Sequence, residues 1–272
     1  MSRAIAVFHG EFGRATLYQL NRPFNIHAHR EGHLIFHVGG AEGRVDVDGK
    51  GCPLTGETIV AVSPWEPHNF VPSDMDAGAL FFVLYVNSEW FATGCGGARL
   101  RFGRSQIART SSLDRQVRRA AGMVCAGERL GELDRELRSL IDESHDASWG
   151  ALDGRSERPA LDGATDFRVR KSIRLMQDQA GADIELDAVA RESGLSRPHF
   201  YKLFRTQTGL TPNLFLNTIL MERALDRLVR SEAPVAEIGF NLGFSSQSGF
   251  TKFFSANVGM APTDYRRAAH VI

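Results

Sequence analysis

The chain has 272 residues, of which 43% are hydrophobic, and its basic and acidic residues balance to a formal net charge of zero. This length suits two domains of ordinary size, and the balanced charge excludes a polybasic or polyacidic protein. The sequence contains no apolar run of the roughly 20 residues that a membrane-spanning helix needs.

The cysteines and the first residues bear on the cellular compartment. Cys52, Cys95 and Cys125 have neither metal-ligand nor disulfide spacing, and no basic-then-apolar signal pattern opens the sequence. We therefore expect a cytoplasmic protein whose cysteines are small core residues.

Short runs of β-branched and aromatic residues alternate with Gly, Pro and Asp through the first hundred residues. Examples are His33 to Val38, Gly43 to Val47, Thr58 to Val62 and Ala79 to Val86. Such spacing is typical of an all-β sandwich or a small barrel. We expect this β-domain to occupy residues 1–110.

Histidines are concentrated in the predicted β-domain. His27, His29, His33 and His37 share odd parity, so on an extended strand they would project from one face, and His68 follows later. The arrangement resembles the cupin barrel, whose first motif is His-x-His followed by a glutamate and then a glycine. Here His33 stands near the glutamate's position and Gly40 at the glycine's. The resemblance implies a cupin-like barrel that senses a small molecule.

The histidines have two alternative roles besides plain hydrogen bonding in the core. Imidazoles at this spacing bind Zn, Fe, Cu or Ni, which makes His27, His29, His33 and His68 candidate metal ligands. Histidine in place of the usual acidic ligand instead favours an organic effector, and we expect no metal or other cofactor. The predicted effector-binding residues are His27, His29, His33, Phe36, Trp65 and His68.

The pattern changes to helix from Ser111 onward. One apolar stripe consists of Leu113, Val117, Ala121 and Val124, and a second, after a break near Gly127, of Leu130, Leu133, Leu137, Leu140 and Ile141. This is more apolar surface than a small barrel would cover. We therefore predict that residues 111–144 serve in dimerisation and interdomain contact. Residues 145–165 are polar and include Pro159, which predicts a flexible linker.

The last third of the chain contains a motif twice. Ala190 to Ser196 returns as Gly239 to Ser245, Phe200 to Phe204 returns as Phe250 to Phe254, and Gly209 and Pro212 correspond to Gly259 and Pro262. Each copy has the pattern of a helix-turn-helix: a small residue, a four-residue gap, a turn glycine, an apolar residue and a polar cap. We expect Ser196 and Ser245 to cap the second helix of each unit. Two copies in register indicate a duplicated unit.

A single helix is predicted between the two copies. Thr211-Pro212 provides a cap followed by proline at the first helical position, and Ser231 to Pro234 ends the apolar stripe. About 18 residues give a helix of about 27 Å, which could hold two reading helices roughly 34 Å apart, one turn of DNA. The alternative is a plain helical bundle, which needs no duplicated glycine-turn spacing.

Residues 166–272 resemble the AraC/XylS-type DNA-binding domain. The matching segments are Gly194-Leu195-Ser196, Phe204-Arg205, Gly209 to Pro212, Arg223-Ala224, Gly243 to Ser248, Phe250, Phe253-Phe254, and Gly259 to Pro262 closing on Tyr265-Arg266. The resemblance implies that the DNA-facing residues are Arg197, Pro198, Tyr201, Lys202, Gln247, Ser248, Thr251 and Lys252. Pro198 and Gly249 depart from the pattern by offering little for base contact. This region carries 14 basic and 11 acidic residues, which fits phosphate contact.

Together these features predict an α+β protein of two domains, a cupin-like β-barrel followed by helices and an all-α double helix-turn-helix domain. We expect a sequence-specific transcription regulator, not an enzyme, controlled by a small organic effector in the barrel. Its expected partners are promoter DNA, RNA polymerase and a second copy of the chain, with no membrane. The alternatives are a metal-dependent cupin enzyme tethered to a DNA-binding domain, and a constitutive DNA binder with an inert barrel.

Overall fold

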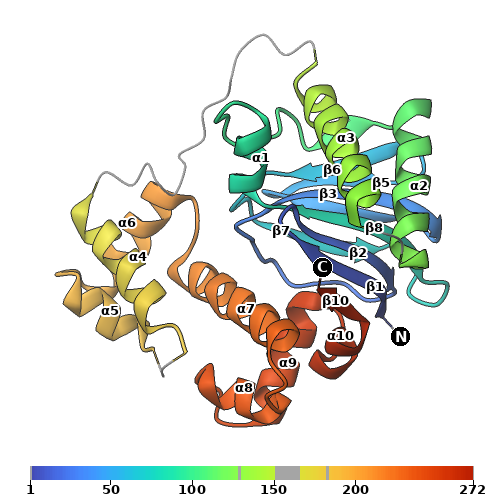
Figure 1. Ribbon diagram of the computed structural model, residues 1–272. Helices are drawn as coiled ribbons and strands as arrows, with labels where there is room; N and C mark the ends of the chain where they lie inside the picture. The colour runs from blue at the N-terminus through green and yellow to red at the C-terminus, as the bar shows by residue number, and fades with distance from the viewer. Residues whose placement is uncertain (1, 128–129, 151–165, 182–183, 272) are drawn as a thin grey trace. The chain divides into compact units, whose positions relative to one another are not determined.

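The computed structural model of the protein describes residues 2–127, 130–150, 166–181 and 184–271 (Figure 1). The chain forms two compact units. One unit combines residues 1–155 with residues 255–272, and the other contains residues 156–254.

The strands of the first unit form two sheets. The strands are β1 (Arg3–Gly10), β2 (Gly13–Leu20), β3 (Gly32–Gly40), β4 (Gly43–Val47), β5 (Lys50–Leu54), β6 (Thr58–Val62), β7 (His68–Pro72), β8 (Ala79–Val86), β9 (Gln106–Ala108) and β10 (Ala269–Val271). The larger sheet has seven strands in the order β10-β1-β2-β8-β3-β6-β9, and the smaller has three in the order β5-β4-β7. The four predicted strands are confirmed, with small changes at their ends.

The larger sheet is covered on both faces. On one face, Phe81 of β8 meets Phe70 of the smaller sheet, with ring centroids 5.0 Å apart. On the other face, Leu34, Phe36 and Phe82 join the core that the helices cover. This explains why β8 reads as a continuous apolar run rather than an alternating one, because both of its faces are buried.

Two helices cover the second face of the larger sheet, α2 (Ser111–Ala126) and α3 (Leu130–Trp149) (Figure 1). As predicted, the break between them lies at Gly127, which ends α2 with a left-handed φ of 66°. Leu113, Val117, Leu137 and Ile141 are each at most 1% exposed, in one core with the sheet. Among the described side chains, most of the apolar surface on which the predicted dimerisation depended is therefore covered within one chain.

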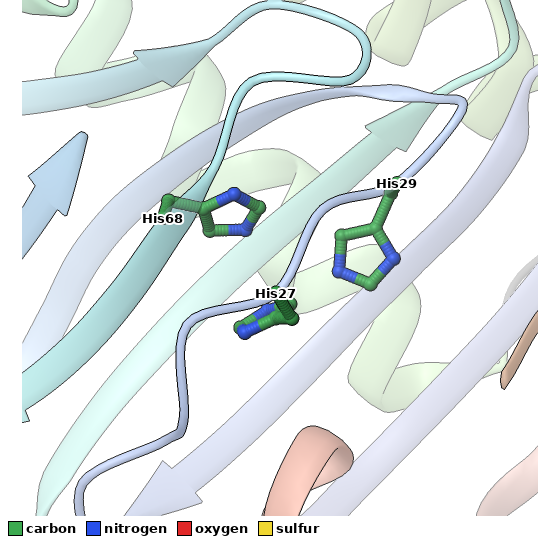
Figure 2. A group of neighbouring side chains, drawn as sticks. All are labelled: His27, His29 and His68. Carbon is green, nitrogen blue, oxygen red and sulfur yellow. The ribbon is translucent and has the colours of Figure 1, made fainter. Parts of the chain in front are cut away.

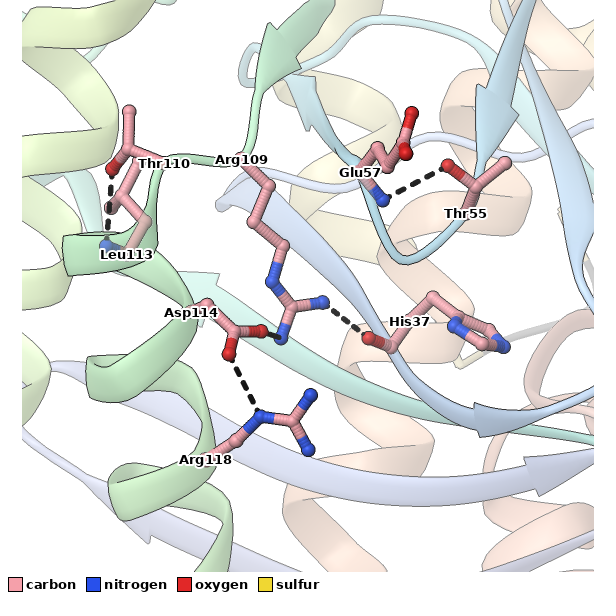
Figure 3. Close-up of polar contacts among 8 residues, drawn as sticks. All are labelled: His37, Thr55, Glu57, Arg109, Thr110, Leu113, Asp114 and Arg118. Carbon is pink, nitrogen blue, oxygen red and sulfur yellow. Dashed lines mark hydrogen bonds and ion pairs between the residues drawn. The ribbon is translucent and has the colours of Figure 1, made fainter.

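A buried arginine fastens the start of α2 to the sheet (Figure 3). The Arg109 side chain is 3% exposed, donates to the backbone carbonyl of His37 and forms an ion pair with Asp114 at 2.8 Å. Thr110 caps the helix by accepting from the backbone N–H of Leu113. The remaining short helix of this region, α1 (Ser88–Gly94), has Asn87 as its cap.

The first unit is completed by residues from the far end of the chain. Helix α10 (Pro262–Ala268) contacts β1, and strand β10 pairs in parallel with β1 at the edge of the larger sheet. Tyr265 on α10 is fully buried, and Arg14 on β2 donates to its hydroxyl at 3.0 Å. The predicted DNA-binding region thus contributes its last residues to the same unit as the β-domain.

The second unit is helical. Its elements are α4 (Phe167–Gln179), α5 (Leu186–Glu192), α6 (Arg197–Thr208), α7 (Pro212–Arg230), α8 (Val235–Asn241) and most of α9 (Gln247–Val258). The turn glycines Gly194 and Gly243 have φ of 73° and 85°, the left-handed region that the predicted motif requires. A Cβ at Gly239 would lie 2.9 Å from Cβ of Phe250, so a small residue is required for the close helix approach.

Some predicted details of this region are corrected. Ser196 occupies the N-cap position of α6 but makes no side-chain capping bond. In the second copy the capping side chain is Ser246 rather than Ser245, since its hydroxyl accepts from the backbone N–H of Gly249 at 3.1 Å. The connecting helix α7 has 19 residues and is capped by Thr211, as predicted.

The predicted linker lies largely outside the described residues. Its first residues, from His145, belong instead to helix α3, which continues to Trp149. Within the described ranges, no helix combines the length and the apolar character needed to cross a membrane.

Candidate functional site

Four histidines meet inside the first unit, and we refer to His27, His29, His33 and His68 as the histidine cluster. His33 lies on β3 and His68 at the start of β7, whereas His27 and His29 lie in the segment that leads into β3. Two backbone hydrogen bonds of 2.9 Å link His27 to His68. This bridge links the segment before β3 to the start of β7, beside the four imidazoles.

The rings of the histidine cluster are in mutual contact. Ring centroids lie 4.4 Å apart for His27 and His68, 4.5 Å for His29 and His33, and 4.8 Å for His33 and His68. In His27, His29 and His68, one ring nitrogen of each lies within 4.8 Å of the others (Figure 2). All four residues are at most 8% exposed.

Hydrogen bonds to the backbone define the tautomers of two of these rings. Nδ1 of His27 lies 2.7 Å from the carbonyl oxygen of Asn25, and Nδ1 of His68 lies 2.9 Å from that of Glu66. A carbonyl oxygen can only accept, so each Nδ1 carries the proton and each Nε2 keeps a lone pair. Within the described chain, Nε2 of His29, His33 and His68 is buried without a hydrogen-bond partner.

Burial keeps the cluster uncharged. Desolvation lowers the pKa of His27 and holds the pKa values of His29, His33 and His68 well below the ordinary value. Repulsion within the cluster adds to this effect: His33 lowers the pKa of His29, and His68 lowers that of His33. The site therefore presents neutral imidazoles at neutral pH.

A cross-strand row of side chains continues from the cluster across the sheet. His33 pairs with Tyr85 on β8, Tyr85 pairs with Arg14 on β2, and Arg14 pairs with His9 on β1. The Tyr85 ring lies 4.2 Å from the His33 ring, and the Arg14 guanidinium lies 3.5 Å from the Tyr85 ring centroid. Arg14 and Tyr85 were absent from the sequence prediction. Arg14 in particular reads as an ordinary solvated charge until the strand order is known.

The other predicted effector residues are arranged differently. Phe36 lies on the opposite face of β3 from His33, in the core beneath α2 and α3, so it does not reach the cluster. Trp65 adjoins the cluster through its backbone N–H, which donates to the carbonyl of His29 at 2.7 Å. His37 lies outside the cluster, with Nε2 near the carbonyls of Gly40 and Ala41, as expected for a strand residue without a special role.

The predicted DNA-facing residues occupy equivalent positions on α6 and α9. The side chains of Arg197, Pro198, Lys202, Gln247, Ser248 and Lys252 are exposed, and those of Tyr201 and Thr251 are half-buried. The next apolar positions, Phe200 and Phe250, are fully buried and hold each helix against its unit. Each helix thus directs its first two turns of polar side chains to solvent.

Two contacts shape the surface of α6. Arg197 forms an ion pair with Asp187 of α5 at 2.9 Å, which orients the guanidinium at the start of the helix. His199 and Arg205 are also exposed on α6 and were not among the predicted residues. Their helical spacing relative to Lys202 was the signal available in the sequence.

Comparison with known proteins assigns the class of the chain. Residues 11–164 match the sequence model of the AraC-like ligand binding domain, and residues 189–268 match that of a helix-turn-helix domain. The first match alone covers more than half of the chain. The protein belongs to the AraC family of transcription regulators, with a sheet-rich ligand-binding domain and a helix-turn-helix domain.

Individual relatives resemble either part or nearly all of the chain. The HTH-type transcriptional activator RhaS of Escherichia coli (strain SE11) is 31% identical over 100 residues, which are 37% of this chain and 36% of RhaS. The match thus spans little more than a third of RhaS. The structure of ToxT from Vibrio cholerae O395 resembles 93% of this chain and 96% of its own, with a TM-score of 0.61 and 11% identity. This likeness concerns the fold. ToxT from strain SCE256 has also been solved with an unsaturated fatty acid bound.

Proposed function

We propose that the protein is a transcription regulator that binds promoter DNA through α6 and α9 and is controlled by a ligand bound at the histidine cluster. The observation that carries this proposal is the duplicated helix-turn-helix, with left-handed glycine turns and exposed polar first turns in both copies. The family membership of the ligand-binding half supports the second part.

The exposed side chains suggest separate roles in DNA contact. The amide of Gln247 can pair with adenine, and Lys202 and Lys252 can donate to guanine or to phosphate. Arg197, Tyr201, Ser248 and Thr251 complete the proposed surface, while Pro198 adds only apolar contact. A base-reading side chain affects preference at one position of the site, whereas a phosphate contact strengthens binding to every sequence.

Binding of full-length protein to a selected DNA pool tests this function. We expect a defined sequence motif for the wild type. The Lys202→Ala and Gln247→Ala double variant should lose about 1–3 kcal/mol of binding free energy for each base contact removed. A matched control is Arg230→Ala, which removes an exposed basic side chain from the end of α7. Unchanged sequence-specific binding in the double variant at moderate salt would contradict the proposal.

The proposal also includes a non-catalytic role, a cellular location and two protein partners. The relatives with assigned names are regulators, which favours a non-catalytic role over the tethered cupin enzyme. A cytoplasmic location, contact with RNA polymerase and a homodimer remain predictions. For the dimer, sedimentation of full-length protein is the direct measurement, since most described side chains of the apolar stripes that suggested it are buried within one chain.

A further inference from the structure

The histidine cluster has an unusual donor set for a buried site. Its four imidazoles lie against one another, and among the described residues three of the Nε2 atoms have no partner. A buried polar atom without a partner costs free energy, so three of them on rings that lie against one another call for a ligand. A ligand that only accepts hydrogen bonds would not satisfy the Nε2 lone pairs of His27 and His68.

We propose that His27, His29 and His68, with His33 as a fourth ligand, bind one divalent late transition-metal ion, with zinc as the type. This proposal rests on the proposed function, because it names the ligand class of the same site. Imidazole nitrogens suit zinc, copper and nickel, whereas magnesium and calcium require oxygen ligands. The sequence had favoured an organic effector. The grouped ring nitrogens, three of them buried without a partner, are the reason for choosing the metal instead.

The geometry needs only a modest contraction to hold an ion. Tetrahedral ligands at about 2.0–2.1 Å from zinc stand roughly 3.3 Å from one another. The nitrogens of His27, His29 and His68 already lie within 4.8 Å of one another without an ion.

The surroundings prepare two of the proposed ligands. His27 and His68 donate from Nδ1 to the backbone carbonyls of Asn25 and Glu66, which orients each Nε2 and raises its basicity as a ligand. Arg14 is a nearby cation, but it lies one strand beyond Tyr85, so the Tyr85 ring stands between its guanidinium and His33.

The test uses untagged full-length protein that has been stripped with EDTA and dialysed into metal-free buffer. Titration with Co²⁺ should produce the visible absorption of a nitrogen-ligated ion, saturating at one equivalent per chain. Zn²⁺ should displace the cobalt and raise the melting temperature, and Mg²⁺ should do neither. Absence of saturable Co²⁺ and Zn²⁺ binding at micromolar concentrations in the wild type would overturn the proposal.

Variants locate the ion. His29→Gln and His68→Gln keep most of the side-chain volume and should each weaken Co²⁺ binding by about 100-fold or more, since outer-shell partners alone are worth about 10- to 100-fold. His37→Gln is the matched control on the same strand as His33 and should bind as the wild type does. Far-UV circular dichroism checks that each variant is folded. Equal binding by His29→Gln and His68→Gln would place the metal elsewhere and overturn the assignment.

Two further measurements separate the outcomes. If acetate stabilises the stripped protein and Co²⁺ does not bind, the site takes an anion near Arg14 and the metal proposal is wrong. A preparation that binds DNA sequence-specifically but binds no metal would refute the metal proposal. It would leave the proposed regulator function standing. Stoichiometric metal binding without sequence-specific DNA binding would support the metal and contradict the proposed regulator function.

Discussion

At the scale of single residues, the first unit contains polar groups that are buried far more deeply than their types usually allow. Arg14 is 4% exposed, and within the described chain it has no carboxylate partner; it is held by the Tyr85 ring and the Tyr265 hydroxyl. The four imidazoles of the histidine cluster are buried beside it. Such groups make stability sensitive to small chemical changes, because the protein has already removed them from water.

The metal-free protein should become less stable as the pH falls below 6.5. Unfolded histidines take up protons near that pH, whereas the lowered pKa values of the cluster keep the folded ones neutral. The unfolded state then binds more protons, so stability falls until the folded pKa values are reached, by about 1 kcal/mol per histidine between pH 7 and 5.5. Urea unfolding across this range measures the slope.

A matched pair of variants assigns this pH effect to the cluster. His29→Gln should reduce the slope by about one proton, while His199→Gln, at an exposed position on α6, should leave it unchanged. A stability that is flat from pH 7 to 5.5 would show that the imidazoles are not held neutral.

Tyr265→Phe should destabilise the first unit by about 1–3 kcal/mol, because it removes the hydroxyl that accepts from the buried Arg14 guanidinium. Nε2 of His9 lies 3.0 Å from the same hydroxyl, so the substitution would remove this hydrogen bond as well. Tyr201→Phe provides the comparison, since Tyr201 is half-buried on α6 and far less enclosed. Thermal unfolding followed by near-UV circular dichroism checks both, and equal melting temperatures for wild type and Tyr265→Phe would count against the described contact.

At the scale of elements, the turns of the two helix-turn-helix units depend on backbone conformation rather than on side-chain space. A Cβ at Gly194 would meet no atom within 4 Å, yet φ there is 73°. Any cost of substitution must therefore come from the left-handed conformation itself.

Gly194→Ala should accordingly cost about 1 kcal/mol of unfolding free energy, and Gly194→Asn distinctly less, because asparagine tolerates the left-handed region. Gly122→Ala should instead raise the unfolding free energy, by about 0.5–1 kcal/mol. Gly122 is exposed within α2, and a Cβ added there would meet no atom within 4 Å. Chemical denaturation of the three variants gives the comparison. A cost for Gly194→Asn equal to that for alanine would mean that the turn is restricted by something other than φ.

The elements also show what could be predicted from the sequence. Local patterns identified β3, β4, β6, β8, the helices α2 and α7 and both glycine turns, because each depends on residues close together in the chain. The pattern did not identify β1 and β2, in which charged and small residues such as Arg14 interrupt the apolar alternation. Of the site, the histidine spacing predicted the cluster. It could not place Phe36 on the far face or Arg14 beside Tyr85, since both follow from non-local strand pairing.

At the scale of the whole molecule, the boundaries of the compact units do not follow the order of the sequence. Residues 255–272 belong with the β-domain, although the sequence assigned them to the DNA-binding region. Strand β10 shields the edge of β1, which would otherwise present unpaired backbone groups.

Truncation after Val258 should therefore affect the β-domain. We expect amide exchange at Val7 and Phe8 of β1 to accelerate by at least about tenfold, which corresponds to a loss of about 1.4 kcal/mol of local protection. A peptide of residues 255–272 added in trans should restore part of this protection. The control is a shorter fragment that ends after Trp149 and lacks the whole helical unit. Its exchange is measured with and without the same peptide. Unchanged exchange in β1 would mean that the last residues contribute nothing to the sheet.

The pairing of β10 with β1 has a consequence for how the protein is made. Strand β1 (Arg3–Gly10) is synthesised well before β10 (Ala269–Val271), the strand that covers its edge. Until β10 has been synthesised, the nascent sheet has a bare edge at β1, which favours pairing with other chains and recruitment of chaperones.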